Sequence, residues 1–323
     1  MKVVIFARGA YWSAADELMR AFVEQGIDCV MISLKTDLGM KRLRKEDLSS
    51  IYFCTKEGSN KKVLEWNEGG QTHINITRAQ DILEEADRVI CVPSSMIRRI
   101  ERQLKNKPTV IVSTKYYKEK DIFEVRKKKP YPIFAVPSFI EYCPKGSYIF
   151  FPPYEFPSID KTKDEKKVLV MHGLLWDTEK QIVLKGSEKI RRGIDLAKRE
   201  VDFEYEEICK LPFWEAMTKK AKAHIFVDCL NSALGSGKSV WEAIALDSVI
   251  MNCSLRDTFV PNKFFPERFP IVDIRTPKDL ANKLVELISD REKLNLEMAK
   301  VSEWKKYLSH KHVVEYFLSC WGI

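Results

Sequence analysis

Hydrophobic positions along the chain follow two patterns, short continuous runs and runs with a helical period. Residues 2–7 (KVVIFA) form an apolar run after Lys2, residues 14–25 carry apolar side chains three and four positions apart before Gly26, and residues 27–33 (IDCVMIS) are again mostly apolar. A short apolar run predicts a buried strand, and a period of 3.6 predicts an amphipathic helix. The pattern therefore predicts a strand–loop–helix–strand unit, which is how a doubly wound parallel sheet begins.

The same pattern starts again after a segment of different composition. Residues 151–166 combine three prolines with a cluster of charges, which is typical of a linker. Residues 167–172 (KVLVMH) then predict a new first strand, followed by a helix at 186–199 and a strand at 201–205. We therefore expect an α/β protein with two Rossmann-like domains and a cleft at the carboxyl ends of both sheets.

The domain prediction is an N-terminal domain at 1–150, a linker at 151–166, a C-terminal domain at 167–305 and a final segment at 306–323 that returns to the N-terminal domain. Further helices are expected at 77–86, 94–104, 212–221, 279–287, 292–307 and 312–318. Further strands are expected at 51–54, 88–92, 109–113, 131–136 and 147–151, and residues 56–70 are expected to form a loop with a short helix.

Residues 223–252 are the stretch with the clearest chemical content. An apolar run ends at Asp228, a small and polar loop follows, and a helix is predicted from Ser239. Backbone N–H groups at the start of such a helix attract a phosphate, so Gly235, Ser236, Gly237 and Ser239 are candidate phosphate contacts. A P-loop of a nucleoside triphosphatase is the alternative, but its first glycine would fall on Ser232.

Charge is concentrated in one segment. Residues 98–129 hold twelve basic and four acidic residues, so this segment contains the whole net charge of +8. Tyr116 and Tyr117 lie among these charges. The segment is either a solvated helix face with a basic loop, or a surface for a polyanion such as nucleic acid or an anionic membrane.

Cysteine and histidine usage gives no metal-binding pattern. The eight cysteines include no CxxC pair and the five histidines include no HxxxH pair, so we expect reduced thiols, a cytoplasmic location and no metal. No apolar run approaches the length of a membrane span, and the sequence begins directly with a predicted strand.

Several stretches of the second half resemble one enzyme family. They are FFPPYEFP (150–157), VLVMHG (168–173), LKGSEKIRRGIDLA (184–197), FWEAMTKKAKAHIFVD (213–228), GSGKSVWEAIALDSVIMN (235–252) and EWKKYLSHKHVVEYFL (303–318). In this order they resemble the nucleotide-binding domain and closing helices of the group-4-like GT-B glycosyltransferases. The first half resembles the family only in its pattern of strands and helices.

The resemblance implies a retaining, metal-independent transfer of a sugar from a nucleoside-diphosphate sugar, with no other cofactor. It assigns the leaving diphosphate to Lys185 and Lys180 and the ribose to Glu242. It places Gly9 where donor and acceptor approach each other, and His172 in the donor site. Candidate acceptor contacts are Arg8, Tyr11, Trp12, Tyr116 and Tyr117. The alternative roles are a satisfied core histidine for His172, core aromatics for Tyr11 and Trp12, an exposed helix-start lysine for Lys185 and a simple ion pair with a lysine for Glu242.

One position departs from the family. The first of its two donor-motif glutamates falls on Leu234, whose side chain cannot accept a hydrogen bond from a sugar. Asp228 or Asn231 could replace it, or the protein could bind a sugar nucleotide without catalysis. Because the basic segment lies in the acceptor half, we expect an anionic acceptor such as DNA with a hydroxymethylated base, or a glycan or lipid.

Overall fold

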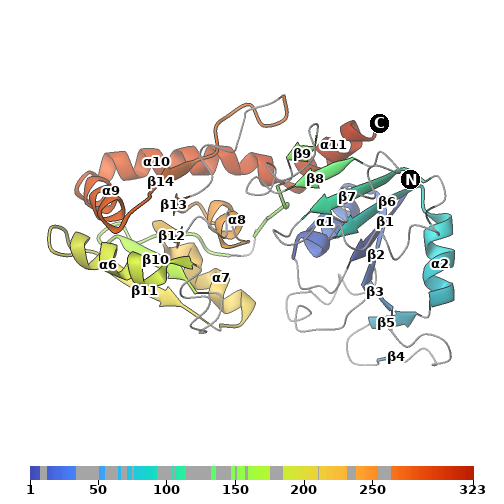
Figure 1. Ribbon diagram of the computed structural model, residues 1–323, viewed down its shortest axis with the longest axis horizontal. Helices are drawn as coiled ribbons and strands as arrows, with labels where there is room; N and C mark the ends of the chain where they lie inside the picture. Colours follow the sequence, from blue (N-terminus) through green and yellow to red (C-terminus); the bar gives the residue numbers. More distant parts are fainter. Residues whose placement is uncertain are drawn as a thin grey trace. The chain divides into compact units, whose positions relative to one another are not determined.

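Figure 1 shows the computed structural model of the 323-residue chain. The chain divides into two compact units, one formed by Met1–Pro153 with His310–Ile323, the other by Tyr154–Ser309. The structure describes residues 1–7, 13–33, 51–54, 65–66, 71–74, 76–92, 104, 107–113, 132–135, 147–149, 151–156, 159–174, 185–209, 211–230, 238–253 and 263–323.

The described strands of the first unit form one sheet in the order β4-β5-β3-β2-β1-β6-β7-β8-β9. Adjacent strands are parallel except β4 and β5. The strands are β1 (Lys2–Ala7), β2 (Asp28–Ser33), β3 (Ile51–Cys54), β4 (Glu65–Trp66), β5 (Gln71–Ile74), β6 (Arg88–Val92), β7 (Thr109–Ser113), β8 (Ile133–Ala135) and β9 (Tyr148–Ile149). The described helices of this unit are α1 (Ser13–Glu24), α2 (Ile76–Glu85) and α11 (His310–Cys320).

The last helix, α11, packs against α1 through aromatic rings. Phe317 is fully buried and stacks on Phe134 of β8 with ring centroids 4.3 Å apart, and its edge meets Phe22 of α1 at 6.1 Å. Aromatic pairs at these separations add to the free energy of burial. The C-terminal segment is therefore part of the hydrophobic core of the first unit.

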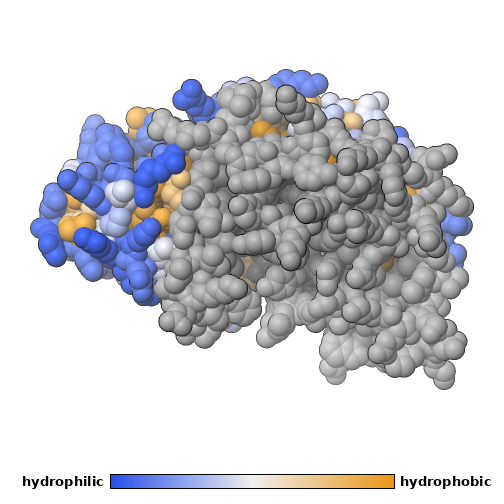
Figure 2. Space-filling view, viewed as in Figure 1, coloured by the Kyte–Doolittle hydropathy of each residue, from blue (hydrophilic) through white to orange (hydrophobic). Residues whose placement is uncertain are grey.

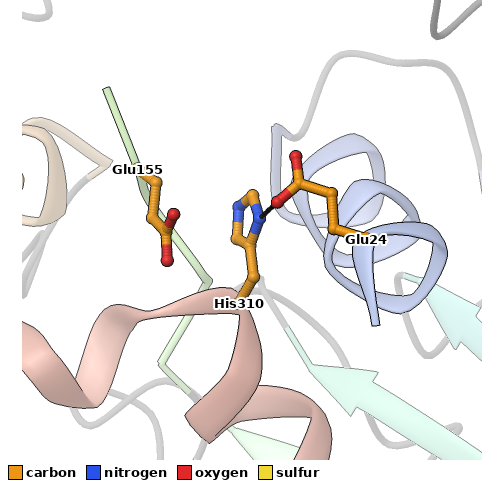
Figure 3. A group of neighbouring side chains, drawn as sticks. All are labelled: Glu24, Glu155 and His310. Atoms are coloured by element: carbon orange, nitrogen blue, oxygen red, sulfur yellow. Dashed lines mark hydrogen bonds and ion pairs between the residues drawn. The ribbon is translucent and has the colours of Figure 1, made fainter. Parts of the chain in front are cut away.

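A contact between two polar side chains marks the start of α11. His310 Nδ1 lies 2.5 Å from Glu24 Oε2 at the end of α1, and His310 is buried (Figure 3). Glu17, which lies two helical turns before Glu24 on α1, is 3.9 Å from His310 Nε2 and pairs with Arg20 at 2.7 Å. Buried polar groups are retained when they have such partners, so this pair fixes where α11 begins on α1.

The second unit contains a smaller, fully parallel sheet in the order β11-β10-β12-β13-β14. Its strands are β10 (Leu169–Gly173), β11 (Glu204–Ile208), β12 (Ile225–Cys229), β13 (Val249–Asn252) and β14 (Ile271–Asp273). Among the residues that the structure describes, its helices are α6 (Ser187–Ala197), α7 (Phe213–Lys222), α8 (Lys238–Ala245), α9 (Pro277–Ser289) and α10 (Arg291–Trp304), followed by the short helix η6 (Lys305–Leu308). Strand residues such as Val170, Ile225 and Met251 share one core with apolar residues of α6 and α9.

Residues 154–166, which we expected to belong to a linker, lie in the second unit. Lys163 accounts for much of their attachment, because its ammonium donates to the carbonyl oxygens of Ala221 (3.0 Å), Ala223 (2.5 Å) and Leu246 (3.2 Å). These carbonyls lie at the carboxyl ends of α7 and α8, where a cation is favoured by the helix dipole.

The strand expected at 201–205 is displaced by three residues, since β11 spans Glu204–Ile208. β11 is an edge strand of the sheet, so one of its sides faces water and glutamates are tolerated there. A search for continuous apolar runs therefore does not detect it. Arg191 of α6 pairs with one of them, Glu207, through two bonds of 2.8 Å.

Three short strands also differ from the expectation. β4 lies within residues 56–70, where we expected a loop with a short helix, and β5 and β14 were not predicted. Strands of two to four residues have too little pattern to be read from sequence, and pairing with a neighbour decides their conformation. The helix expected at 292–307 is divided into α10 and η6.

No helix in the described ranges has the length and apolar content needed to cross a membrane. Figure 2 shows mainly hydrophilic residues on the described surface over α6 and α9, with isolated hydrophobic positions. The six cysteines whose state the structure gives are free thiols.

Candidate functional site

Lys185 lies where three parallel strands of the second unit end. Its ammonium donates to Asp228 Oδ1 at 2.8 Å, at the end of β12, and to the carbonyl oxygen of Gly173 at 3.1 Å, the last residue of β10. Asn252, the last residue of β13, donates from Nδ2 to the other carboxylate oxygen of Asp228 at 2.9 Å. We refer to Gly173, Lys185, Asp228 and Asn252 as the lysine cluster, and all four are buried.

The backbone around Lys185 explains how its side chain reaches these strand ends. Gly186, which follows Lys185 and precedes α6, has a φ of 70°. Residues with a Cβ rarely adopt this backbone conformation. The carbonyl oxygen of Lys185 accepts a hydrogen bond of 2.9 Å from the N–H of Leu230, just beyond β12. The sequence Lys-Gly thus places a cation at the carboxyl edge of the sheet, immediately before a helix begins.

Gly173 brings the start of α8 to the same edge. A Cβ on Gly173 would lie 2.9 Å from Cζ of Phe226 and 3.7 Å from Oγ of Ser239, the second residue of α8. The predicted phosphate contact Ser239 therefore lies beside the last residue of β10, close to the lysine cluster.

Replacing Gly173 by alanine is expected to lower the free energy of unfolding by about 1–3 kcal/mol, because the new methyl group overlaps a buried ring. A urea titration measures the loss. In a second background, Phe226→Leu removes the overlapping ring atoms, and adding Gly173→Ala there is expected to cost much less. An equal cost in both backgrounds would contradict the assignment to Phe226.

His172 lies on β10, next to Gly173, and is fully buried. Its Nδ1–H donates to the carbonyl oxygen of Val227 at 2.7 Å, and its Nε2 accepts from the hydroxyl of Ser187 at 2.9 Å. Burial, together with the charge of Lys185, lowers the pKa of His172 to about 4, so the ring is neutral at pH 7. Both ring nitrogens are satisfied inside the unit, and a donor contact by His172 stays a prediction.

Glu242 on α8 is also buried and has a buried partner. Lys220 of α7 donates to Glu242 Oε2 at 2.6 Å, and the same ammonium lies 4.9 Å from the ring centroid of Phe226. This ion pair joins α7, α8 and β12 behind Gly173. The ribose contact assigned to Glu242 by resemblance stays a prediction. A ribose hydroxyl that binds this carboxylate would share it with the ammonium of Lys220.

Asp228 was one of two candidates to replace the missing donor glutamate. Both of its carboxylate oxygens have partners, Lys185 on one side and Asn252 on the other, and the residue is 1% exposed. In this arrangement Asp228 orients Lys185. The second candidate, Asn231, and Leu234 itself lie outside the described residues.

Most other predicted contacts lie outside the described residues. These are Lys180, Gly9, Gly235, Ser236, Gly237, Arg8, Tyr11, Trp12, Tyr116 and Tyr117. In the basic segment 98–129 the structure describes Lys107, whose ammonium donates to the carbonyl oxygens of Glu84 (2.6 Å) and Ala86 (2.7 Å) at the end of α2. One of the twelve basic residues therefore has a structural role.

Sequence reasoning missed three residues around the site. Asn252 and Ser187 hold Asp228 and His172 in place, and Lys220 pairs with Glu242. The signal for Asn252 was present, since a polar residue that ends a buried parallel strand points to the functional edge of the sheet. Nothing in the local sequence distinguishes Lys220 from the exposed lysines of α7.

Solved structures of similar architecture decide the fold. HepE of Anabaena, solved with UDP and glucose, matches with a TM-score of 0.64 at 11% identity, over 100% of both chains. TarM of S. aureus, solved with UDP and an α-GlcNAc-glycerol, matches with a TM-score of 0.64 at 10% identity, over 99% of both chains. MurG of Acinetobacter baumannii matches with a TM-score of 0.53 at 15% identity, over 98% of this chain and 99% of that one.

This chain has a GT-B fold. The fold expected from the two repeated strand–helix patterns is thereby confirmed. No protein-family profile and no curated protein sequence matches the chain.

Proposed function

We propose that the protein is a glycosyltransferase that takes its sugar from a nucleoside-diphosphate sugar. The observation that supports this most directly is Lys185, a buried ammonium at the carboxyl edge of the sheet in a GT-B fold, close to the start of α8. Breaking the anomeric C–O bond leaves charge on the diphosphate, and preorganised positive groups stabilise that charge. HepE and TarM were solved with UDP, so UDP sugars are the first donors to test.

In this proposal the leaving diphosphate meets the ammonium of Lys185 and the backbone N–H groups at the start of α8. Two hydrogen-bonding directions of the ammonium go to Asp228 and Gly173, which leaves its third N–H for a phosphate oxygen. Lys180 and the loop residues Gly235, Ser236 and Gly237 would complete the phosphate contacts, and Gly9 the approach of donor and acceptor. Retention of configuration and metal independence follow from the family resemblance, and turnover in EDTA tests the latter.

The direct test incubates the protein with a panel of nucleotide sugars and measures release of nucleoside diphosphate, with and without acceptor. Release from one donor is the expected result. Calorimetry with UDP, CDP, GDP and ADP measures binding separately. Neither binding nor release with any donor would overturn the proposal.

Glu242→Gln is expected to weaken binding of the matching nucleoside diphosphate by about tenfold to a hundredfold, the effect of losing a charged hydrogen bond to a ribose hydroxyl. Lys220→Met is the matched control, since it removes the same ion pair from the other side. If both changes weaken nucleotide binding equally, Glu242 acts by holding α7 against α8, and the ribose role is wrong.

The acceptor we propose is anionic, because residues 98–129 hold eight more basic than acidic residues. DNA with a hydroxymethylated base and a lipid-linked or other glycan are the two candidates, and Arg8, Tyr11, Trp12, Tyr116 and Tyr117 are the proposed acceptor contacts. Transfer to hydroxymethylated DNA that weakens with salt and on neutralising residues 126–129 would support DNA. Transfer to a vesicle-bound glycolipid would support a lipid-linked glycan as the acceptor.

A nucleotide-sugar-binding protein without catalysis is the second candidate function. Leu234 favours it, as does the engagement of both Asp228 oxygens inside the protein. Donor binding without release of nucleoside diphosphate, over the whole acceptor panel, would decide for it.

A further inference from the structure

Two cysteines lie directly beside the lysine cluster. Cys229 ends β12 and follows Asp228, and Cys253 follows Asn252, the last residue of β13. Their sulfur atoms are 3.7 Å apart, and both side chains are buried, Cys229 fully and Cys253 to 4% exposed. The described free thiols thus include a pair at contact distance, placed at the proposed nucleotide site.

The two sulfurs are close enough for a disulfide bond to form after a small approach. An S–S bond is about 2.05 Å long, so closure requires the two sulfurs to approach from 3.7 Å. The ladder between β12 and β13 is already irregular between Val227 and Cys229, where the register shifts. Irregular pairing allows a small change at this end of the strand without loss of the rest of the ladder.

The two thiols are also chemically unequal. The hydrogen bond between them raises the pKa of Cys229 and lowers that of Cys253, while burial raises both and the carboxylate of Asp228 adds to this. Arg275 favours the thiolate of Cys253 as well. Cys253 is the more acidic thiol, which is the order required when one cysteine attacks an oxidant and its partner resolves the product.

We propose that Cys229 and Cys253 form a reversible disulfide that weakens nucleotide binding at the lysine cluster; the second half of this statement rests on the proposed function. Closure pulls on the residues next to each sulfur, Asp228 and Asn252, whose hydrogen bond orients the carboxylate that holds Lys185. A shift of about 1 Å in a positioning group can lower the rate of a catalysed reaction by about a hundredfold.

The oxidant we propose is a peroxide. The Cys253 thiolate attacks one oxygen of hydrogen peroxide, and the O–O bond breaks. Hydroxide is the leaving group, and Cys253 becomes a sulfenic acid. The sulfur of Cys229 then loses its proton and attacks the sulfenic sulfur, so that the S–S bond forms, the S–O bond breaks and hydroxide leaves with that proton as water. Two thiols and one peroxide give one disulfide and two waters, and a dithiol reductant reverses the change.

Peptide mapping tests the disulfide on the unmodified full chain. After reduction, peroxide treatment and thiol blocking, trypsin is expected to yield residues 223–238 and 239–256 as one cross-linked species, because each peptide contains one cysteine of the pair. Dithiothreitol should separate them. Cys253→Ser should abolish the species, while Cys320→Ser, a change in the other unit, should leave it. Sulfinic acid on Cys253 with no cross-link would overturn the proposal.

The regulatory half has its own measurement. UDP is expected to bind the oxidised chain about tenfold to a hundredfold more weakly than the reduced chain, the effect of losing one charged hydrogen bond, with recovery after dithiothreitol. Equal affinity of a cross-linked and a reduced chain would refute control of binding and leave a modification site alone. Should no nucleotide bind the reduced chain, the proposed function fails, whereas the mapping result stands by itself.

Discussion

Replacing Lys185 by methionine is expected to lower turnover of a nucleotide sugar by about a hundredfold to a thousandfold, the cost of removing one preorganised group that stabilises leaving-group charge. The same change leaves the carboxylate of Asp228 buried without its cation, since Asn252 supplies one neutral hydrogen bond. Breaking a buried ion pair from one side costs about 3–5 kcal/mol. Single-turnover kinetics and a urea titration measure the two losses.

A double variant separates chemistry from folding. Adding Asp228→Asn to Lys185→Met removes the unpaired charge while keeping an acceptor for Asn252, so the free energy of unfolding should largely recover and turnover should not. Lys189→Met is the matched control, because it changes the same residue type on the exposed face of α6. Recovery of turnover in the double variant would show that Lys185 acts only as the structural partner of Asp228.

The larger features of the fold could be predicted from sequence because the buried strands and helices carry clear patterns of hydrophobic residues. The continuous run at Lys2–Ala7 became the central strand β1, and the helical period before Gly26 became α1, with Leu18 and Phe22 fully buried. Edge strands carry weaker patterns, since one of their sides faces water. This is why β11 was misplaced and β14 was not seen.

The candidate site was predictable in its residue types and much less in its contacts. The Lys-Gly pair and the strand ending at His172 and Gly173 pointed to the edge of the sheet where the ammonium of Lys185 lies, because carboxyl ends of parallel strands meet there. The partner of Lys185 could not be found by spacing, since Asp228 is 43 residues away and meets it through sheet order. The same holds for Cys229 and Cys253, which lie on neighbouring strands.

Acid is expected to destabilise the second unit between about pH 6.5 and pH 4, because the pKa values of two of its histidines, His172 and His224, are lowered in the folded chain. The pKa of His172 is about 4 in the folded chain, against 6.5 when free, because of burial first and the charge of Lys185 second. In this interval the unfolded chain binds a proton that the folded chain does not, so the free energy of unfolding falls as pH falls. The full loss from His172 is about 3 kcal/mol.

His224 contributes in the same direction. Burial and the neighbouring Arg291 lower its pKa to about 4, and its Nδ1 accepts a hydrogen bond of 3.1 Å from the N–H of Leu169, which a protonated ring could not accept. Urea titrations across the interval, followed by hydrogen exchange of β10, are expected to show stability falling with pH. His172→Asn keeps a donor for Val227 and an acceptor for Ser187 and should weaken this dependence, leaving the part due to His224, whereas His312→Asn in α11 of the other unit should not change it. An unchanged slope in His172→Asn would mean that this ring is not the group whose protonation unfolds the sheet.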